Sequence, residues 1–155
     1  SGGMAKMMGT IWLILCAMVF GGIMDAIGAL AKISSFMLQL FDSVFGLFAS
    51  TVFTCIGLNF TASDQYLAIV VPGKMYSKAF KEKGLAPENL SRTLEDSGTV
   101  TSVLIPWNTC GAYHSGVLGV SVGEYFIYAI FNWLSPFTTL LFAAFRIKIR
   151  QLASK

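Results

Sequence analysis

The stretch Asp96–Gly119 most constrains the fold, because it is apolar enough to lie in a bilayer yet is interrupted at its middle by Pro106, Asn108 and Gly111. Proline lacks a backbone donor and clashes with the preceding turn, and glycine loosens a helix. A helix over this stretch is therefore predicted to break. Unpaired amides are costly in hydrocarbon, so such a break is tolerated only where protein or a water-lined cavity surrounds it. A broken helix at membrane depth indicates a binding site.

The composition is typical of a membrane protein. Of the 155 residues, 55% are apolar and 12% charged, whereas a soluble domain carries about 25% charged residues. The net charge of +3 comes mainly from 74–92 and 146–155, without the basic stripe that binds nucleic acid, so nucleic acid is not an expected partner. The three cysteines lie far apart in apolar surroundings and are interpreted as reduced packing residues; they are Cys16, Cys55 and Cys110. We therefore expect an all-α membrane protein in a lipid bilayer.

Two segments, 7–32 and 122–146, are predicted to be full transmembrane helices. Met7–Met24 and Tyr125–Phe145 are uncharged, and with their flanks they approach or exceed the roughly 20 residues that span a bilayer. Asp25 has two open interpretations: it faces a partner or cavity within the span, or it lies near the headgroups close to Lys32.

Residues 35–76 are predicted to form a re-entrant helical hairpin. One helix over this length, at about 1.5 Å per residue, would be twice the roughly 30 Å of hydrocarbon. The polar cluster Asn59–Gln65 separates two short apolar arms, and Pro72 and Gly73 are expected to end the second arm.

The basic residues orient these segments across the plasma (inner) membrane. Under the positive-inside rule, the tail 147–155 is cytoplasmic, and so is the loop 77–95 if 96–120 crosses once as a broken helix. A hairpin with both ends inside also leaves Lys32 on the cytoplasmic side.

The hairpin tip and the helix break supply oxygens that suit a hard cation such as sodium. Half-helices ending at a break carry partial charges, and free carbonyls near Ile105 would face the site. The candidate cation ligands are Ile105, Asn108, Thr109, Thr61, Ser63 and Asp64. The candidate carriers of a coupled proton are Asp25, Asp64 and Asp96.

Structural roles compete with these assignments. Asn59, Thr61 and Ser63 suit helix caps, which is compatible with ligation. An N-cap role at the start of the broken helix is favoured for Asp96 over a ligand role. For His114, a packed or hydrogen-bonded role is favoured over a proton relay.

Three stretches carry a resemblance to a known family: Thr10–Gly22, Asn89–Val100 with L-E-D-S-G-T, and Leu104–Tyr113 with P-W-N-T-C-G. Together they resemble the carboxyl-terminal half of NhaC-type Na+/H+ antiporters. The resemblance implies one inverted-repeat half of a secondary transporter, with no cofactor beyond the transported Na+ and H+. It also implies that the amino-terminal half of the transporter is missing here, so that this chain alone is inactive unless it forms a homodimer.

Three functions follow as hypotheses. The first is Na+/H+ exchange. The second is an organic-anion exchanger, since the resemblance extends to malate and lactate antiporters and an amide end near Cys110 and Gly111 would receive a carboxylate. The third is a non-transporting membrane subunit whose polar breaks pack against a partner. An enzyme is not expected, because the sequence has no nucleophile with a base, metal cluster or phosphate loop.

Overall fold

The computed structural model describes Met8, Trp12, Val19, Ile23, 26–28, Lys32, 43–61 and 64–152. Within these residues every regular element is helical, apart from one isolated antiparallel bridge between Leu85 and Gln151. The predicted all-helical class is thus confirmed for this part of the chain. Most of the predicted spanning helix 7–32, including Asp25, lies outside the described residues, as does Ser63.

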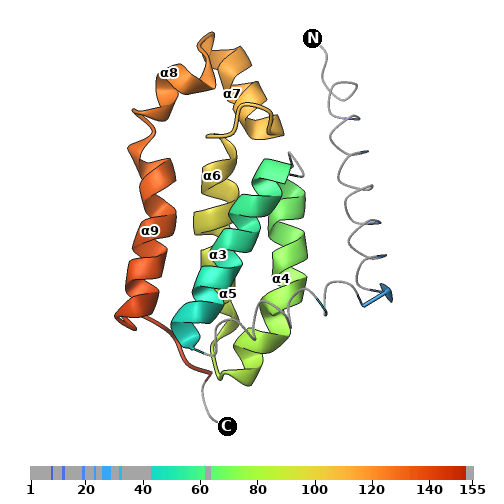
Figure 1. The fold of residues 1–155 in the computed structure, drawn as a ribbon, viewed down its shortest axis with the longest axis vertical. Coiled ribbons are helices and arrows are strands. Elements are labelled where there is room, and N and C mark those ends of the chain that lie inside the picture. The colour runs from blue at the N-terminus through green and yellow to red at the C-terminus, as the bar shows by residue number, and fades with distance from the viewer. Residues whose placement is uncertain are drawn as a thin grey trace.

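Two helices of equal length form a hairpin. They are α3 (Val44–Thr61) and α4 (Gln65–Glu82), which run side by side in opposite directions in Figure 1. Their contact is apolar at one end, where the rings of Phe48 and Phe80 lie 5.2 Å apart. Among the described residues, α3 is the one helix long and apolar enough to cross a membrane by length and composition. The helical hairpin is present, and its re-entrant course in a bilayer stays a prediction.

The expected end of the second arm at Pro72 and Gly73 is wrong, because α4 continues through both residues to Glu82. Pro72 is buried within the packed hairpin, where tertiary contacts offset its missing hydrogen bond. Gly73 is instead a packing residue, since a Cβ added there would lie 3.3 Å from Leu94 Cδ1. Its small size lets α4 approach the next helix.

The interval 77–95, predicted as a cytoplasmic loop with a basic helical end and a second short helix on either side of Gly84 and Pro87, is mostly helical. After a short connection at 83–86, α5 (Pro87–Leu94) leads directly into the π-helix η1 (Glu95–Thr99) and α6 (Val100–Ser102). Proline suits the first position of α5, where its missing N–H has no helical partner. The N-cap role favoured for Asp96 is also wrong, because that residue lies inside this helical arm.

The predicted helix break is present at 103–108, between α6 and α7 (Thr109–Leu118). α7 ends at Gly119, whose φ of 71° is the left-handed conformation that favours glycine. In Figure 1, α7 lies at the same end of the molecule as the tip of the α3–α4 hairpin.

The single helix predicted over 122–146, with a kink at Pro136, is instead divided before that proline into α8 (Val122–Phe126) and α9 (Ile130–Ala144). The residues between them, 127–129, include neither proline nor glycine, so the sequence carries no local signal for this turn. After α9 the chain returns to the α4–α5 connection, where Leu152 N donates to Gly84 O at 2.8 Å.

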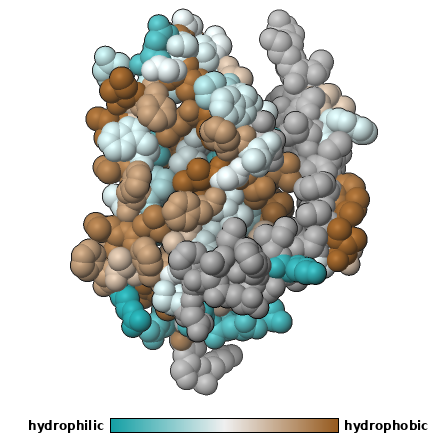
Figure 2. Space-filling model, viewed as in Figure 1, coloured by the Kyte–Doolittle hydropathy of each residue, from teal (hydrophilic) through white to brown (hydrophobic). Residues whose placement is uncertain are grey.

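The described surface is strongly apolar over the middle of the molecule. Figure 2 shows brown side chains across this region and hydrophilic ones at the upper end and at the lower end, the latter being where α4 and α9 end in Figure 1. α9 leaves Phe131 and Phe137 about two-thirds exposed, at 70% and 65%. Large exposed apolar side chains of this kind are expected where lipid or another helix replaces water.

Candidate functional site

The end of α3 and the helix break contact each other directly. Trp107 Nε1 donates to the Phe60 carbonyl at 2.8 Å, and the two rings meet edge to face with centroids 4.6 Å apart. Asn108 Nδ2 donates to the Asn59 carbonyl at 3.2 Å. The last carbonyls of a helix have no partner within it, and here side chains from the break bond to two of them. The two polar interruptions therefore form one junction.

Asn59 is the centre of this junction and is fully buried. Its side-chain amide donates to Gly98 O at 2.6 Å in η1 and to Thr101 Oγ1 at 3.1 Å in α6. Its Oδ1 accepts from Asn108 Nδ2 at 3.3 Å. One side chain thus joins the hairpin to both sides of the broken arm. Sequence reasoning placed Asn59 in the tip but left it out of the ligand set, although an amide in an apolar run was the available signal.

Asn108, a predicted cation ligand, is fully buried and caps α7. Its Oδ1 accepts from Cys110 N at 3.1 Å, and its backbone N donates to the Ile105 carbonyl at 3.1 Å. The Ile105 carbonyl, expected to be free, is therefore bonded within the turn. It also lies against α7, because a Cβ at Gly111 would be only 2.1 Å from that oxygen. The Asn108 side-chain oxygen and the Ile105 carbonyl oxygen thus accept hydrogen bonds that stabilise the break.

Gln65 forms a second contact between the hairpin and the broken arm. Its Oε1 accepts from Ser102 Oγ at 3.1 Å and from Cys110 Sγ at 2.7 Å. Ser102 and Cys110 lie on opposite sides of the break, in α6 and α7. The first turn of α4 therefore fixes both half-helices, a role that sequence reasoning did not assign to Gln65.

Asp64 begins α4 and is 3% exposed. Its Oδ1 accepts from Tyr66 N at 2.7 Å and from Leu67 N at 3.2 Å, which is the geometry of a helix N-cap. Its Oδ2 is buried and accepts no hydrogen bond. This carboxylate, predicted both as a cation ligand and as a proton carrier, keeps one oxygen without a partner.

The other predicted ligands differ in their surroundings. Thr61 and Thr109 are exposed, and the Thr61 hydroxyl donates to Gly57 O at 2.8 Å in its own helix. Ser63 and Asp25 lie outside the described residues. His114 is exposed, and its Nδ1 lies 2.9 Å from Cys110 O. The ligand roles of Thr61, Thr109 and Ser63 and the proton-carrier role of Asp25 stay predictions, whereas the contact of His114 agrees with the hydrogen-bonded role favoured for it.

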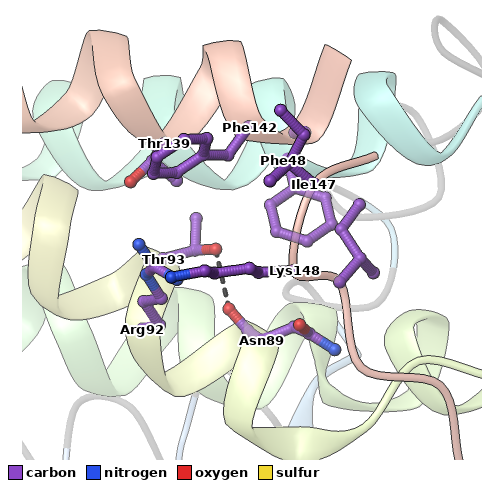
Figure 3. A pocket seen from close by; sticks show the side chains of 10 residues that line it. Phe48, Asn89, Arg92, Thr93, Thr139, Phe142, Ile147 and Lys148 are labelled. Carbon is purple, nitrogen blue, oxygen red and sulfur yellow. Dashed lines mark hydrogen bonds between the residues drawn. The ribbon is translucent and has the colours of Figure 1, made fainter. Parts of the chain in front are cut away.

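Asp96 contacts α9 rather than the hairpin tip. Its Oδ2 accepts from Thr139 Oγ1 at 2.6 Å, its Oδ1 accepts from Ser135 Oγ at 3.3 Å, and Arg92 Nε lies 3.6 Å from Oδ2. Figure 3 shows Arg92 and Thr139 at the edge of a small cavity of about 20 Å³. A cavity of this size has room for about one water. Both carboxylate oxygens of Asp96 are therefore bonded between two helical arms.

A larger groove of about 330 Å³ lies beside the junction, between α3, the break and α9. Its lining is almost entirely apolar, and Thr101 is the one hydrogen-bonding side chain in it apart from Trp133. Such a lining does not suit a cation, which needs several oxygens. At the end of the molecule that carries the hairpin tip, the polar groups are concentrated at the junction rather than in this groove.

Comparison with known proteins identifies the family of this chain. The model of the Na+/H+ antiporter family matches residues 1–147. The chain belongs to the Na+/H+ antiporter family. The resemblance predicted from the sequence is thus confirmed, and the family is one of membrane-embedded transporters.

Three curated proteins are similar over most of the chain. The Na(+)/H(+) antiporter NhaC of Alkalihalophilus pseudofirmus is 39% identical, covering 99% of this chain and 34% of the relative. The NhaC of Bacillus subtilis is 35% identical over 90% of this chain and 31% of the relative. The malate-2H(+)/Na(+)-lactate antiporter of Bacillus subtilis is 31% identical over 86% of this chain and 28% of the relative. The chain therefore spans about a third of the length of these relatives. No solved structure matches it.

Proposed function

We propose that the protein carrying this sequence exchanges Na+ for H+ across the plasma membrane, and that the junction of hairpin tip and helix break belongs to its ion site. Two relatives named Na(+)/H(+) antiporter, 39% and 35% identical, support the exchanged ions. The observation that carries the site is the direct contact of Asn59 with Asn108, because it joins two interruptions of helix in an apolar chain. Broken helices at membrane depth are where secondary transporters bind ions.

The proposed orientation has the carboxyl-terminal tail and the α4–α5 connection in the cytoplasm. Basic residues around this connection and the tail include Lys81, Arg92, Lys148 and Arg150, and the positive-inside rule favours the cytoplasmic side for such a cluster. The hairpin would then enter and leave from the cytoplasm. Because the chain covers about a third of its relatives, we propose that further polypeptide completes the site, from the same protein or from a second copy.

The test is proton flux in everted vesicles from a bacterial host that lacks its own Na+/H+ antiporters. The protein is expressed from its full reading frame, a pH gradient is imposed, and its dissipation is followed with a fluorescent amine. We expect NaCl to dissipate the gradient and choline chloride to leave it unchanged. Equal responses to both salts, at verified expression, would contradict Na+/H+ exchange.

A second function, organic-anion exchange coupled to Na+ or H+, is supported by the similarity to the malate-2H(+)/Na(+)-lactate antiporter. The amide end of α7 at Cys110 and Gly111 is the feature that would bind a carboxylate, in competition with Asn108 Oδ1, which accepts from Cys110 N. Uptake of labelled malate and lactate into the same vesicles separates the two functions. Uptake that depends on an imposed gradient would favour the anion exchanger, and detection of any flux would contradict a purely structural subunit.

A further inference from the structure

The small cavity drawn in Figure 3 has two basic side chains in its lining. Arg92 comes from α5 and Lys148 from the turn after α9, and their nitrogen atoms gather at the same side of the cavity. Two positive charges that face one cavity repel each other, and an anion bound between them would remove that repulsion. The mouth of this cavity is therefore a candidate anion site.

The carboxylates nearby leave part of this positive charge without a partner. Arg92 Nε lies 3.6 Å from Asp96 Oδ2, an oxygen that also accepts from Thr139 Oγ1. Because Nε faces Asp96, the two terminal NH2 groups of the guanidinium remain for a ligand. Glu88 is paired with Arg150 at 3.8 Å. Within the described part of the chain, Lys148 has no carboxylate partner.

The turn that carries Lys148 has an unfavourable backbone conformation and is held in place from the far side. Lys148 has a φ of 55°, in the left-handed region that few residues other than glycine adopt. Beyond it, Asn89 Nδ2 in α5 donates to Arg150 O at 2.6 Å, and Arg150 N donates to Asn89 Oδ1 at 3.2 Å. Backbone strain that the surrounding structure maintains is concentrated at ligand sites. The turn thus holds Lys148 at the same cavity as Arg92.

Apolar side chains continue from the cavity along α9. The Phe142 ring lies below the guanidinium, with its centroid 5.5 Å from Arg92 Cζ, and Phe145 and Ile147 are exposed next to it. In Figures 1 and 2, this end of α9 lies where the apolar middle of the molecule meets its hydrophilic lower end. A phospholipid in a bilayer has its phosphate at such a border and its acyl chains on the apolar side. A soluble anion would gain nothing from these apolar side chains.

From these contacts we infer that the cavity binds the phosphate of an anionic phospholipid, with Arg92 and Lys148 as its ligands and the acyl chains along α9. A phosphate oxygen is about the size of a water, so one oxygen fits the volume of about 20 Å³ while the rest of the phosphate lies at the mouth. The planar guanidinium of Arg92 suits two phosphate oxygens at once. In the proposed orientation the lipid belongs to the cytoplasmic leaflet. The inference requires a membrane-embedded chain and does not depend on which ions are exchanged.

The experiment measures lipid binding by native mass spectrometry of the protein purified from its full reading frame. The protein is titrated in detergent with phosphatidylglycerol, or with phosphatidylcholine that has the same acyl chains. We expect one phosphatidylglycerol to bind about tenfold more tightly than phosphatidylcholine, because the choline group cancels the phosphate charge. Equal affinities for the two lipids would overturn the inference.

A soluble phosphate separates a lipid site from a site for free anions. Glycerol phosphate carries the same phosphate without acyl chains, so at a concentration equal to that of phosphatidylglycerol it should leave lipid binding unchanged. Displacement of the lipid under these conditions would identify a site for free phosphate and would contradict a lipid site.

The variant Lys148→Gln removes one charged contact with the phosphate, and we expect phosphatidylglycerol to bind about tenfold more weakly or worse. The matched control is Arg146→Gln, which removes the same charge from the same turn. Arg146 is also exposed and has a φ of 53°, but it does not line the cavity. Its general attraction for anionic lipid is worth up to about fivefold in affinity. Equal losses in the two variants would mean diffuse attraction without a site, and would reject the inference.

Thermal unfolding without added lipid shows whether the two variants are equally stable. If Lys148→Gln melts at a lower temperature than Arg146→Gln, Arg92→Lys takes its place in the titration. Arg92→Lys keeps a positive charge close to Asp96 and loses the planar guanidinium, so we expect phosphatidylglycerol to bind about fivefold more weakly. An unchanged affinity in Arg92→Lys would then overturn the inference.

Discussion

Replacing Gly111 by alanine should disrupt the turn that follows the helix break. A Cβ at this position would lie 2.1 Å from the Ile105 carbonyl oxygen and 3.0 Å from its carbon. Separations under 3.0 Å are not found for real Cβ atoms, so the backbone must move by about 0.9 Å. The Ile105 oxygen cannot move freely, because it accepts the 3.1 Å bond from Asn108 N. Displacing it disturbs the cap of α7 and the contact with Asn59.

The expected cost follows from these contacts. Overpacking against a rigid backbone costs about 1–3 kcal/mol, and loss of the Asn108–Ile105 hydrogen bond adds about 1 kcal/mol. Gly111→Ala should therefore destabilise the protein by about 2–4 kcal/mol. Gly116, in the same helix, has no atom within 4 Å of its added Cβ. Gly116→Ala should be neutral or stabilise by up to about 1 kcal/mol, because alanine is the better helix former.

The assay is thermal unfolding of the two purified variants in the same detergent, followed by tryptophan fluorescence, with sodium-dependent proton flux measured in parallel. Gly111→Ala should melt at a lower temperature than the original protein and lose most of its flux. Gly116→Ala should match the original in both. Equal melting temperatures for the two variants would refute the tight approach of the Ile105 carbonyl to α7.

Three further changes probe the contacts of the broken arm in the same unfolding assay. Asn59→Ala removes three hydrogen bonds of a fully buried side chain and should cost about 3 kcal/mol; an unchanged melting temperature would contradict its central position. Trp107→Phe keeps an aromatic ring but loses the bond to Phe60 O, so a smaller cost of about 1 kcal/mol is expected, and a loss as large as that of Asn59→Ala would argue against it. Thr139→Val keeps the side-chain shape and removes the 2.6 Å hydrogen bond to Asp96. Because the acceptor is charged, we expect a loss of about 1.5–3 kcal/mol in the free energy of unfolding. An unchanged melting temperature would mean that this bond contributes little to stability.

The helix break could be predicted because its causes are local. Pro106 and Gly111 act on their own backbone, and Asn108 is a residue type that caps helices, so short-range chemistry identifies the interruption. The polar tip at Asn59–Gln65 was recognisable for the same reason. The contact between this tip and the helix break had no local signal. It was expected only because two polar segments in an apolar chain tend to pack together.

The features that sequence reasoning missed depend on tertiary packing. Pro72 does not end α4, because burial against the neighbouring helices compensates for its lost hydrogen bond. The π-helix at Glu95–Thr99 is accompanied by the bond from Asn59, a residue far away in the sequence, to the Gly98 carbonyl. No local pattern specifies such a contact.

The assignment of free and bonded oxygens could not be predicted either. From the sequence, the Ile105 carbonyl, the Asn108 side chain and the Asp64 carboxylate are equivalent candidates to supply an oxygen ligand to a cation. Only the folded arrangement distinguishes them, since hydrogen bonds within the turn occupy the first two and leave Asp64 Oδ2 without a donor. A ligand set based on residue type alone therefore mixes oxygens that already accept hydrogen bonds with one that does not.

The most direct test of the account is a density map, at a resolution that shows side chains, of the full-reading-frame protein in lipid nanodiscs. The account predicts non-helical backbone over 103–108 at membrane depth, with the side chains of Asn59 and Asn108 in hydrogen-bonding contact. An uninterrupted helix from Ser97 to Gly119, or a break that lies outside the bilayer and apart from the end of α3, would contradict it.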